Sequence, residues 1–293
     1  MKNTTADAMP LVESVLHPTD FSPASERAFA HALAIALLRQ TELTILHVGP
    51  EHESDVEWTR YPSVRQTLSR WGLLEAGSPR SSVFDELRVK VSKIALQSRH
   101  PVHATAAFLD HEPTDLIVLA TEGREGLTSW VNRSYAEAIA RWSRTMTLFV
   151  PADSKRDLVS LSDGERSLKN ILVPVDSQPD CTAAVEFARR AAEILGDGNV
   201  SITLLHVGVD QPVIPALEEG PEWTWHVENR QGAPVAEILS AADRHVAELI
   251  VMATAGHEGV LDVLRGSTTE QVLRRAPCPL LAVPAERKFQ SAT

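Results

Sequence analysis

The chain has 293 residues, which predicts about two domains at the usual size of roughly 100 to 200 residues each. Its 43% hydrophobic and 23% charged residues are typical of a globular protein. The longest apolar run, residues 32–38, is much shorter than the roughly 20 residues of a membrane-spanning helix, and residues 1–14 lack the apolar core of a secretory signal. The net charge of −11 would repel nucleic acid. We therefore expect a cytoplasmic protein with neither membrane nor nucleic acid as a partner.

Short apolar runs bounded by turn residues alternate with longer segments of helical period, which is typical of an α/β fold with a parallel sheet. A helix is expected over residues 21–40, where Ser22 is a good N-cap and Pro23 suits the first turn. A second, amphipathic helix over 64–74 has no counterpart in the other half of the chain. The strands are expected at 12–18, 43–48, 88–96, 115–121 and 146–151, and again at 170–176, 201–207, 223–229, 248–254 and 279–284.

The chain contains an internal repeat. Residues 115–151 align without a gap with residues 248–284, and 14 of these 37 positions are identical, far more than chance would give. Fixed self-similarity of this kind indicates a duplicated domain. The sequence predicts a first domain at 1–151, a polar linker at 152–169, a second domain at 170–284 and a tail at 285–293.

Ligands of an open parallel sheet bind beyond the carboxyl ends of its strands, where the strand order reverses. After the fourth strand of the second half come Gly256 and then Gly266, Ser267 and Thr268, which open the last helix. Glycine lets the backbone approach a phosphate, and a helix N-terminus with hydroxyl groups favours an anion. The same serine also begins a capping box, which would stabilise the helix without any ligand.

The first half provides an internal control for that alternative. Its capping pattern survives at 134–137, but Arg133 stands where the second half has Gly266, so capping does not account for this glycine. A second pair of aligned positions differs in the same way, with Gly232 in the second half and Arg99 in the first. Arg133 would obstruct a phosphate or fill its place with a permanent positive charge. We therefore expect the second half to bind and the first half to have a degenerate site.

These residues resemble the universal stress protein family. The resemblance rests on the Pro-x-Asp end of the first strand, the Leu-His-Val strand and the spacing of the glycine loop, and it covers about 12–151 and 170–284. It implies two tandem Rossmann-like domains of the adenine nucleotide alpha hydrolase-like type, paired through their last strands. Each would have a five-stranded parallel sheet of order 3-2-1-4-5 flanked by helices. The resemblance also implies a role in the stress response and a cofactor, ATP or AMP, with or without Mg²⁺.

Carried onto this sequence, the resemblance puts Asp176 near the adenine or ribose, Val207 against the base, and the glycine loop around the phosphates. The first loop glycine of the family is replaced here by Ala253, and by Ala120 in the first half. The expected nucleotide-binding residues are Pro174, Val175, Asp176, Val207, Ala253, Gly256, Gly266, Ser267 and Thr268.

Three functions remain open from the sequence. The first is a regulatory module that binds an adenine nucleotide in its second half, and the second is a ligand-free tandem scaffold that acts through protein contacts. The third and weakest is a slow ATP hydrolase, because no convincing general base is present. We expect no enzyme activity, intramolecular pairing of the two domains, and the option of a homodimer of tandem chains.

Other residue patterns favour structural roles. His17 and His47 end adjacent expected strands and could meet as two metal ligands, but no third ligand follows at a fixed spacing. For His47 and His206, hydrogen bonding to the backbone at a strand end is the preferred interpretation. Trp223 and Trp225 are expected to pack at a sheet face or a domain interface. Cys181 and Cys278 are expected to be small buried residues, since no CxxC pair is present.

Overall fold

The computed structural model describes residues 12–50, 58, 61–121, 145–210, 212, 214–254 and 268–285. The first half contains β1 (Ser14–Thr19), α1 (Pro23–Arg39), β2 (Glu42–Gly49), α3 (Val64–Arg70), α4 (Ser82–Leu87), β3 (Lys90–Gln97), α5 (Pro101–His111), β4 (Leu116–Thr121) and β5 (Met146–Pro151). The second half contains β6 (Leu168–Pro174), α7 (Thr182–Leu195), β7 (Gly196–Val207), β8 (Trp223–Arg230), α8 (Pro234–Arg244), β9 (Leu249–Thr254), α9 (Thr268–Leu273) and β10 (Leu280–Pro284). Of the helices in these ranges, none is both long and apolar enough to cross a membrane.

The strand positions agree with the sequence prediction. Nine strands begin and end within two residues of the expected bounds, and the tenth, β7, begins five residues early, at Gly196 instead of 201. Helix α1 begins where expected, because the Ser22 hydroxyl accepts a hydrogen bond from the Ser25 N–H at 3.2 Å and Pro23 occupies the first turn. Helix α3 ends at Arg70, earlier than expected. Gly72 follows it at a φ of +72°, a left-handed conformation that interrupts a helix.

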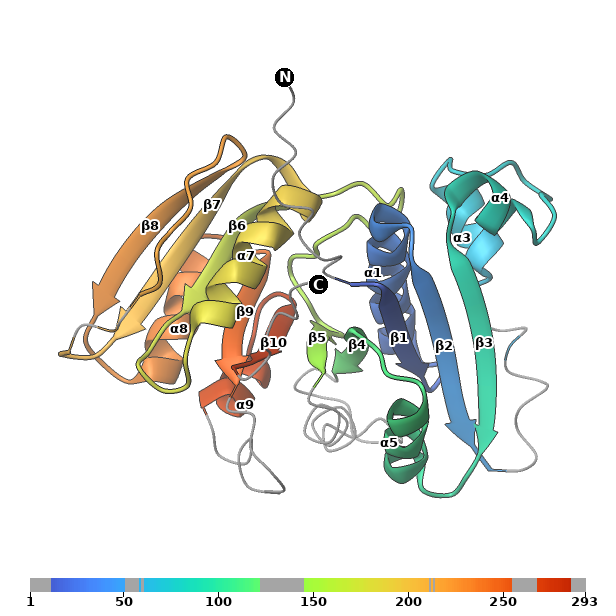
Figure 1. Ribbon diagram of the computed structural model, residues 1–293, viewed down its shortest axis with the longest axis horizontal. Helices are drawn as coiled ribbons and strands as arrows, with labels where there is room; N and C mark the ends of the chain where they lie inside the picture. Colours follow the sequence, from blue (N-terminus) through green and yellow to red (C-terminus); the bar gives the residue numbers. More distant parts are fainter. Residues whose placement is uncertain are drawn as a thin grey trace, which may run out of the picture.

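The ten strands form one sheet in the order β3-β2-β1-β4-β5-β10-β9-β6-β7-β8 (Figure 1). Within each half the neighbouring strands run parallel, and each half has the order 3-2-1-4-5. The predicted fold class is therefore confirmed. The order reverses between β1 and β4 in the first half and between β6 and β9 in the second. These two positions are called the switch points of the sheet.

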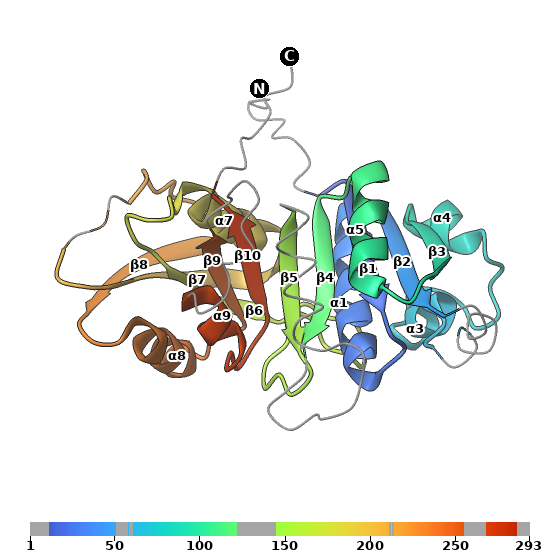
Figure 2. The same cartoon turned by 90° about the horizontal axis from the view of Figure 1, so that it is seen from below.

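The halves join through their last strands, β5 and β10, which lie side by side in the middle of the sheet (Figure 2). This pair is antiparallel, with Phe149 opposite Leu280 and Leu148 opposite Leu281. Both Phe149 and Leu280 are fully buried. Because each strand covers the edge of the other, neither half exposes unpaired backbone groups at this boundary.

Two apolar cores lie on the two faces of the sheet, and each contains residues of both halves. One core includes Leu33 of α1 and Phe187 of α7. The other includes Phe149 and, from α8, Ile238. Cys181 and Cys278 are buried in these cores, as expected. Since both cores cross the boundary, we expect the chain to unfold as one cooperative unit.

The connection between the halves is packed against both of them. Leu158 and Val159 are buried within it, although the polar composition of residues 152–169 gave no sign of this. The guanidinium of Arg27 donates to the Asp157 carboxylate at 2.9 Å, and the buried His31 Nε2 accepts from the Leu158 N–H at 3.3 Å. These contacts fasten the connection to α1.

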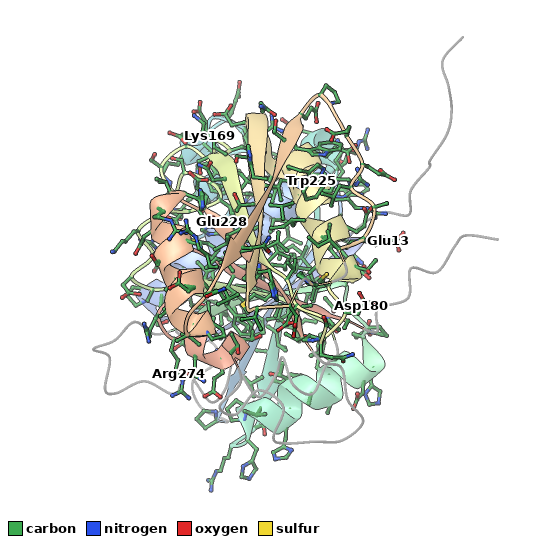
Figure 3. All side chains as sticks on the ribbon, turned by 90° about the vertical axis from the view of Figure 1, so that its left-hand side faces the viewer. Glu13, Lys169, Asp180, Trp225, Glu228 and Arg274 are labelled. Atoms are coloured by element: carbon green, nitrogen blue, oxygen red, sulfur yellow. The ribbon has the colours of Figure 1, made fainter. Side chains whose placement is uncertain are left out.

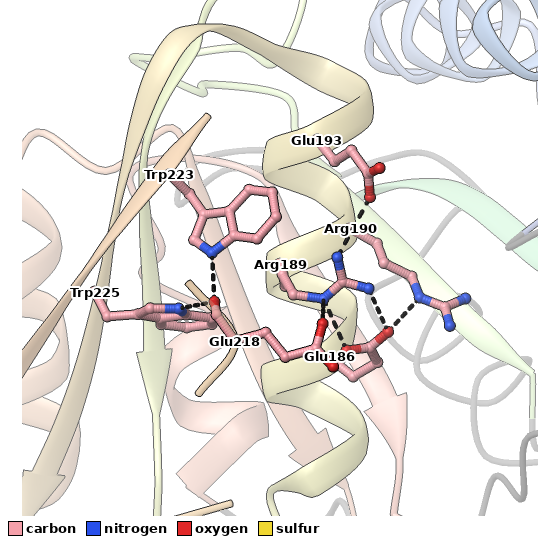
Figure 4. Close-up of polar contacts among 7 residues, drawn as sticks. All are labelled: Glu186, Arg189, Arg190, Glu193, Glu218, Trp223 and Trp225. Atoms are coloured by element: carbon pink, nitrogen blue, oxygen red, sulfur yellow. Dashed lines mark hydrogen bonds and ion pairs between the residues drawn. The ribbon is translucent and has the colours of Figure 1, made fainter. Parts of the chain in front are cut away.

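In the second half the outer strand is β8, and it is packed without counterparts of the helices α3 and α4. The indole N–H groups of Trp223 and Trp225 both donate to the carbonyl of Glu218, at 2.9 and 2.8 Å (Figure 4). The guanidinium of Arg189 lies over the Trp223 ring at 5.5 Å. Gly220 contacts the same ring so closely that a Cβ would come within 2.4 Å of it. The expected packing role of the two tryptophans is confirmed.

Charged side chains fasten α8 to the edge strand β8. The Glu228 carboxylate accepts from Arg244 at 2.8 Å and lies 2.8 Å from His245 Nε2, at the end of the helix. Figure 3 shows Glu228 and Trp225 on this strand, which faces the viewer there. Helix α8 is therefore held in place over one side of the switch point.

The boundary between the halves should carry a large part of the stability. We expect Phe149→Ala to lower the free energy of unfolding by about 3 to 5 kcal/mol, because it opens a cavity in a fully buried position. Phe84→Ala is the matched control: that ring is 53% exposed, and the change should cost less than about 0.5 kcal/mol. Urea unfolding measures both variants. Equal costs, or two separate transitions in the native chain, would contradict the shared core.

Candidate functional site

A cavity of about 320 Å³ opens at the carboxyl ends of β6, β7 and β9, at the switch point of the second half. Six of the nine expected residues line it: Pro174, Val175, Asp176, Val207, Ala253 and Thr268. The other three, Gly256, Gly266 and Ser267, lie outside the described residues. The structure therefore brings together every expected residue that it describes.

Further lining residues were missed from the sequence, namely Gln178, Pro179, Cys181, Leu205, Pro234, Ile238, Met252, Thr254 and Thr269. Strand alternation could have found one of them. Side chains two positions apart on a strand share a face, so Leu205 follows from Val207. Likewise, residues four apart on a helix share a face, which pairs Pro234 with Ile238. These signals identify a face but not the ligand that it contacts.

The chemistry of the wall changes across the sheet. On the side of β7 and α8 the lining is apolar, with Leu205, Val207 and Ile238. On the side of β9 and α9 three threonines, Thr254, Thr268 and Thr269, stand beside Met252 and Ala253. Since β6 lies between β7 and β9 in the sheet, the cavity offers an apolar surface on one side of β6 and hydrogen-bonding groups on the other.

Asp176 follows β6 and is the only charged side chain among the described residues of the wall. It is exposed, and its Oδ1 accepts a hydrogen bond from the Ser177 N–H at 2.7 Å. Its second oxygen can accept from a hydroxyl or an amino group of a ligand. A carboxylate repels a phosphate, so a phosphorylated ligand would direct its phosphates away from Asp176.

His206 positions the end of β6 from the neighbouring strand. Its Nδ1 donates to the carbonyl of Val175 at 3.2 Å, directly before Asp176 in the chain. His47 makes the equivalent bond to Thr19 in the first half, at 2.9 Å. The expected backbone role of these histidines is confirmed. Gly208 permits the arrangement, because a Cβ there would meet the His206 ring at 2.8 Å.

The described part of the first switch point keeps the strand-end aspartate of the second but differs in the next residue, Phe21, whose ring packs on His47 with centroids 4.2 Å apart. Strand register makes Asp20 the counterpart of Asp176, and Asp20 accepts from the Ser22 N–H at 3.0 Å. Arg133, on which the expected difference between the halves depends, lies outside the described residues. Gly232 has a local reason of its own: its φ is +146°, where residues with a side chain are rarely found, so it is no independent sign of a ligand.

The possible metal pair of His17 and His47 has another explanation. His17 is fully buried, its Nδ1 donates to the Val118 carbonyl at 2.9 Å, and its Nε2 lies 2.7 Å from the Tyr61 hydroxyl. Both ring nitrogens are thus engaged within the protein. Within the described ranges, no three side chains of metal-ligating type come together. Burial lowers the pKa of His17 to about 4.

Comparison with known proteins identifies the family. The model of the universal stress protein family matches residues 12–151 and 216–284, which is more than half of the chain. The chain belongs to the universal stress protein family. The second matched segment begins after β7, so Pro174, Val175, Asp176 and Val207 lie outside the family match, and their assignment rests on the resemblance of their strand ends to the family's motifs.

Individual universal stress proteins support the assignment to this family. A universal stress protein of Methanocaldococcus jannaschii is 27% identical over 154 residues, covering 44% of this chain and 89% of that protein. The crystal structure of one from Archaeoglobus fulgidus has a TM-score of 0.61 at 20% identity, covering 93% of this chain and 98% of that one. A putative one from Pseudomonas aeruginosa has a TM-score of 0.60 at 17% identity, covering 95% of each chain. These two structures support the tandem fold.

The buried His17 should make stability depend on pH. Its pKa is about 4 in the folded chain and about 6.5 when unfolded, so the unfolded state takes up a proton first. The stability gained from keeping His17 neutral is fully present above about pH 6.5 and is lost as the pH falls towards 4. The free energy of unfolding then changes by up to about 1.4 kcal/mol per pH unit. His17→Val, which introduces the residue found at the equivalent Val173, should flatten this slope in urea unfolding at several pH values.

His31 is also buried with a lowered pKa, so part of the slope should remain in His17→Val. The control is His226→Val at an exposed position of β8, which should leave the slope unchanged. The comparison uses slopes and is therefore independent of any constant loss of stability caused by the substitution. An unchanged slope in His17→Val would contradict the assignment.

Proposed function

We propose that this universal stress protein is a stress-response regulator that binds ATP or AMP in its second half. The observation that carries the proposal is the meeting of six residues, selected from the sequence, in one cavity at the second switch point. Switch points of open parallel sheets are common ligand sites. The family alone would not select between the halves.

The wall fits an adenine nucleoside. The cavity of about 320 Å³ is within the usual range for small-molecule sites, roughly 300 to 1,000 Å³. The base would lie against Leu205, Val207 and Ile238, where the lining is apolar. Asp176 would accept hydrogen bonds from the ribose hydroxyls or the adenine amino group.

The phosphates would extend towards β9 and α9. Thr254 and Thr268 border the cavity there, and the intervening chain contributes Gly256, Gly266 and Ser267. Glycines permit close approach of backbone N–H groups to phosphate oxygens. Asp176 is the only carboxylate in the described wall, and Mg²⁺ is usually bound by one or two carboxylates together with phosphate oxygens. Mg²⁺ would therefore bind together with the phosphates.

We propose binding without turnover. Hydrolysis would need a general base to orient or activate a water at the terminal phosphate. Asp176 belongs to the nucleoside side of the cavity in this assignment, and the described lining on the phosphate side consists of threonines and small or apolar residues. Nucleotide occupancy would then act by changing the surface that the chain offers to a partner.

Titration calorimetry with ATP tests the site. We expect Asp176→Ala to weaken binding by about tenfold or more, since hydrogen bonds to charged groups contribute roughly 1.5 to 3 kcal/mol. Gly266→Arg, which introduces the arginine of the first half, should abolish binding. Asp20→Ala is the matched control at the equivalent carboxylate and should bind as the native chain does. Undiminished binding in Gly266→Arg would overturn the site assignment. Absence of heat in the native chain would favour the ligand-free scaffold.

A further inference from the structure

A second cavity lies in the first half, far along the sheet from the proposed nucleotide site. It encloses about 490 Å³ between α3, α4 and β3, the outer strand of that half. Helices α3 and α4 belong to the insertion that the second half lacks. The lining residues are Ser63, Val64, Arg65, Arg80, Val83, Phe84, Val89, Lys90, Val91 and Lys93.

The lining is strongly basic in an acidic protein. It contains the four cations Arg65, Arg80, Lys90 and Lys93, and no carboxylate among its described residues. The chain as a whole carries 39 acidic against 28 basic residues. Four cations around one cavity repel each other unless an anion or a nearby carboxylate compensates them.

Only part of this charge is compensated within the described chain. Lys90 pairs with Glu42 at 3.1 Å on the neighbouring strand. Arg65 donates to the carbonyl of Ser78 at 2.6 Å, which is a neutral group and leaves its charge in place. The pKa of Lys93 is lowered by burial and by the positive charge of Arg80. The repulsion between these two residues would be relieved by a bound anion.

The remaining wall is apolar. Val64, Val83, Val89 and Val91 line it, and the Phe84 ring is 53% exposed at the same cavity. Lys93 also lies over the Trp58 ring, with its Nζ at 5.0 Å from the ring centroid. A ligand that uses the whole wall must therefore carry both negative charge and an apolar group.

We propose that this cavity is a second binding site, for small anions with at least two negative charges attached to an apolar ring, such as an aryl phosphate. Arg80 and Lys93 bind the anionic group. Phe84 and the valines contact the ring. The site is independent of nucleotide binding in the second half and uses other residues.

Phenyl phosphate is the probe, with inorganic phosphate and neutral benzyl alcohol for comparison, all followed by calorimetry on the full chain. We expect phenyl phosphate to bind most tightly, inorganic phosphate more weakly, and benzyl alcohol not at all at about 10 mM. Binding should weaken as salt is raised, because the attraction is electrostatic. Absence of phenyl phosphate binding at this concentration would overturn the proposal.

Variants locate the binding. Arg80→Gln combined with Lys93→Gln should weaken phenyl phosphate about tenfold or more. Phe84→Ala should weaken phenyl phosphate but leave inorganic phosphate unchanged, and because this ring is exposed the variant should fold normally. The matched control Lys169→Gln changes an exposed lysine of the second half, which pairs with Asp197, and should bind as the native chain does. Equal binding in the double variant would overturn the proposal.

Two competing explanations are separated by the same assay. Binding that is lost in Gly266→Arg would assign the probe to the phosphate side of the nucleotide site and contradict the second site. The second competing explanation is that carboxylates of the chain itself pair with the cations. Four carboxylates lie at 51–57, outside the described residues. Replacing Glu51, Glu53, Asp55 and Glu57 by their amides distinguishes this case. If phenyl phosphate binds only to that variant, the cavity serves an internal ion pair and the proposal is wrong.

Discussion

Antiparallel pairing of β5 with β10 turns two parallel sheets into one. Each of these strands would otherwise be the exposed edge of a five-stranded sheet, with unpaired backbone groups and apolar side chains such as Phe149 and Leu280 in water. In a single-domain protein a second copy would have to cover this edge. Here the repeat covers it within one chain, and the packed connection through Leu158 and Val159 holds the two copies together.

The shared sheet leaves the two switch points free to diverge, because neither is needed for the pairing of the halves. In the second half, β6, β7 and β9 surround a cavity whose described lining has a single carboxylate, Asp176. The first half instead carries the additional helices α3 and α4, which form a basic cavity near its outer strand. Duplication thus provides one stable framework with two chemically different cavities, and this difference is the basis of both proposals.

Most of the fold could be predicted because its signals are local. Apolar runs bounded by turn residues gave the strands, and Ser22 with Pro23 gave the start of α1. The repeat identified the candidate site, since a shared pattern exposes the positions that differ. The early end of α3 and the positive φ of Gly232 depend on backbone geometry that composition does not report. The contact of His17 with Tyr61 and the burial of Leu158 depend on residues distant in the chain or on a segment too short to show a period. The cations of the second cavity are scattered over 65–93, so only the folded chain brings them together.

The most direct test of the central claim is the nucleotide content of the purified chain. The protein would be denatured, and adenine nucleotide in the supernatant would be identified and counted by mass spectrometry. The account predicts about one nucleotide per chain, held by the second half. Two per chain would contradict the degenerate first site and show that Arg133 is no obstacle. None, together with no binding of ATP at about 1 mM, a limit of roughly −4 kcal/mol, would contradict nucleotide binding altogether.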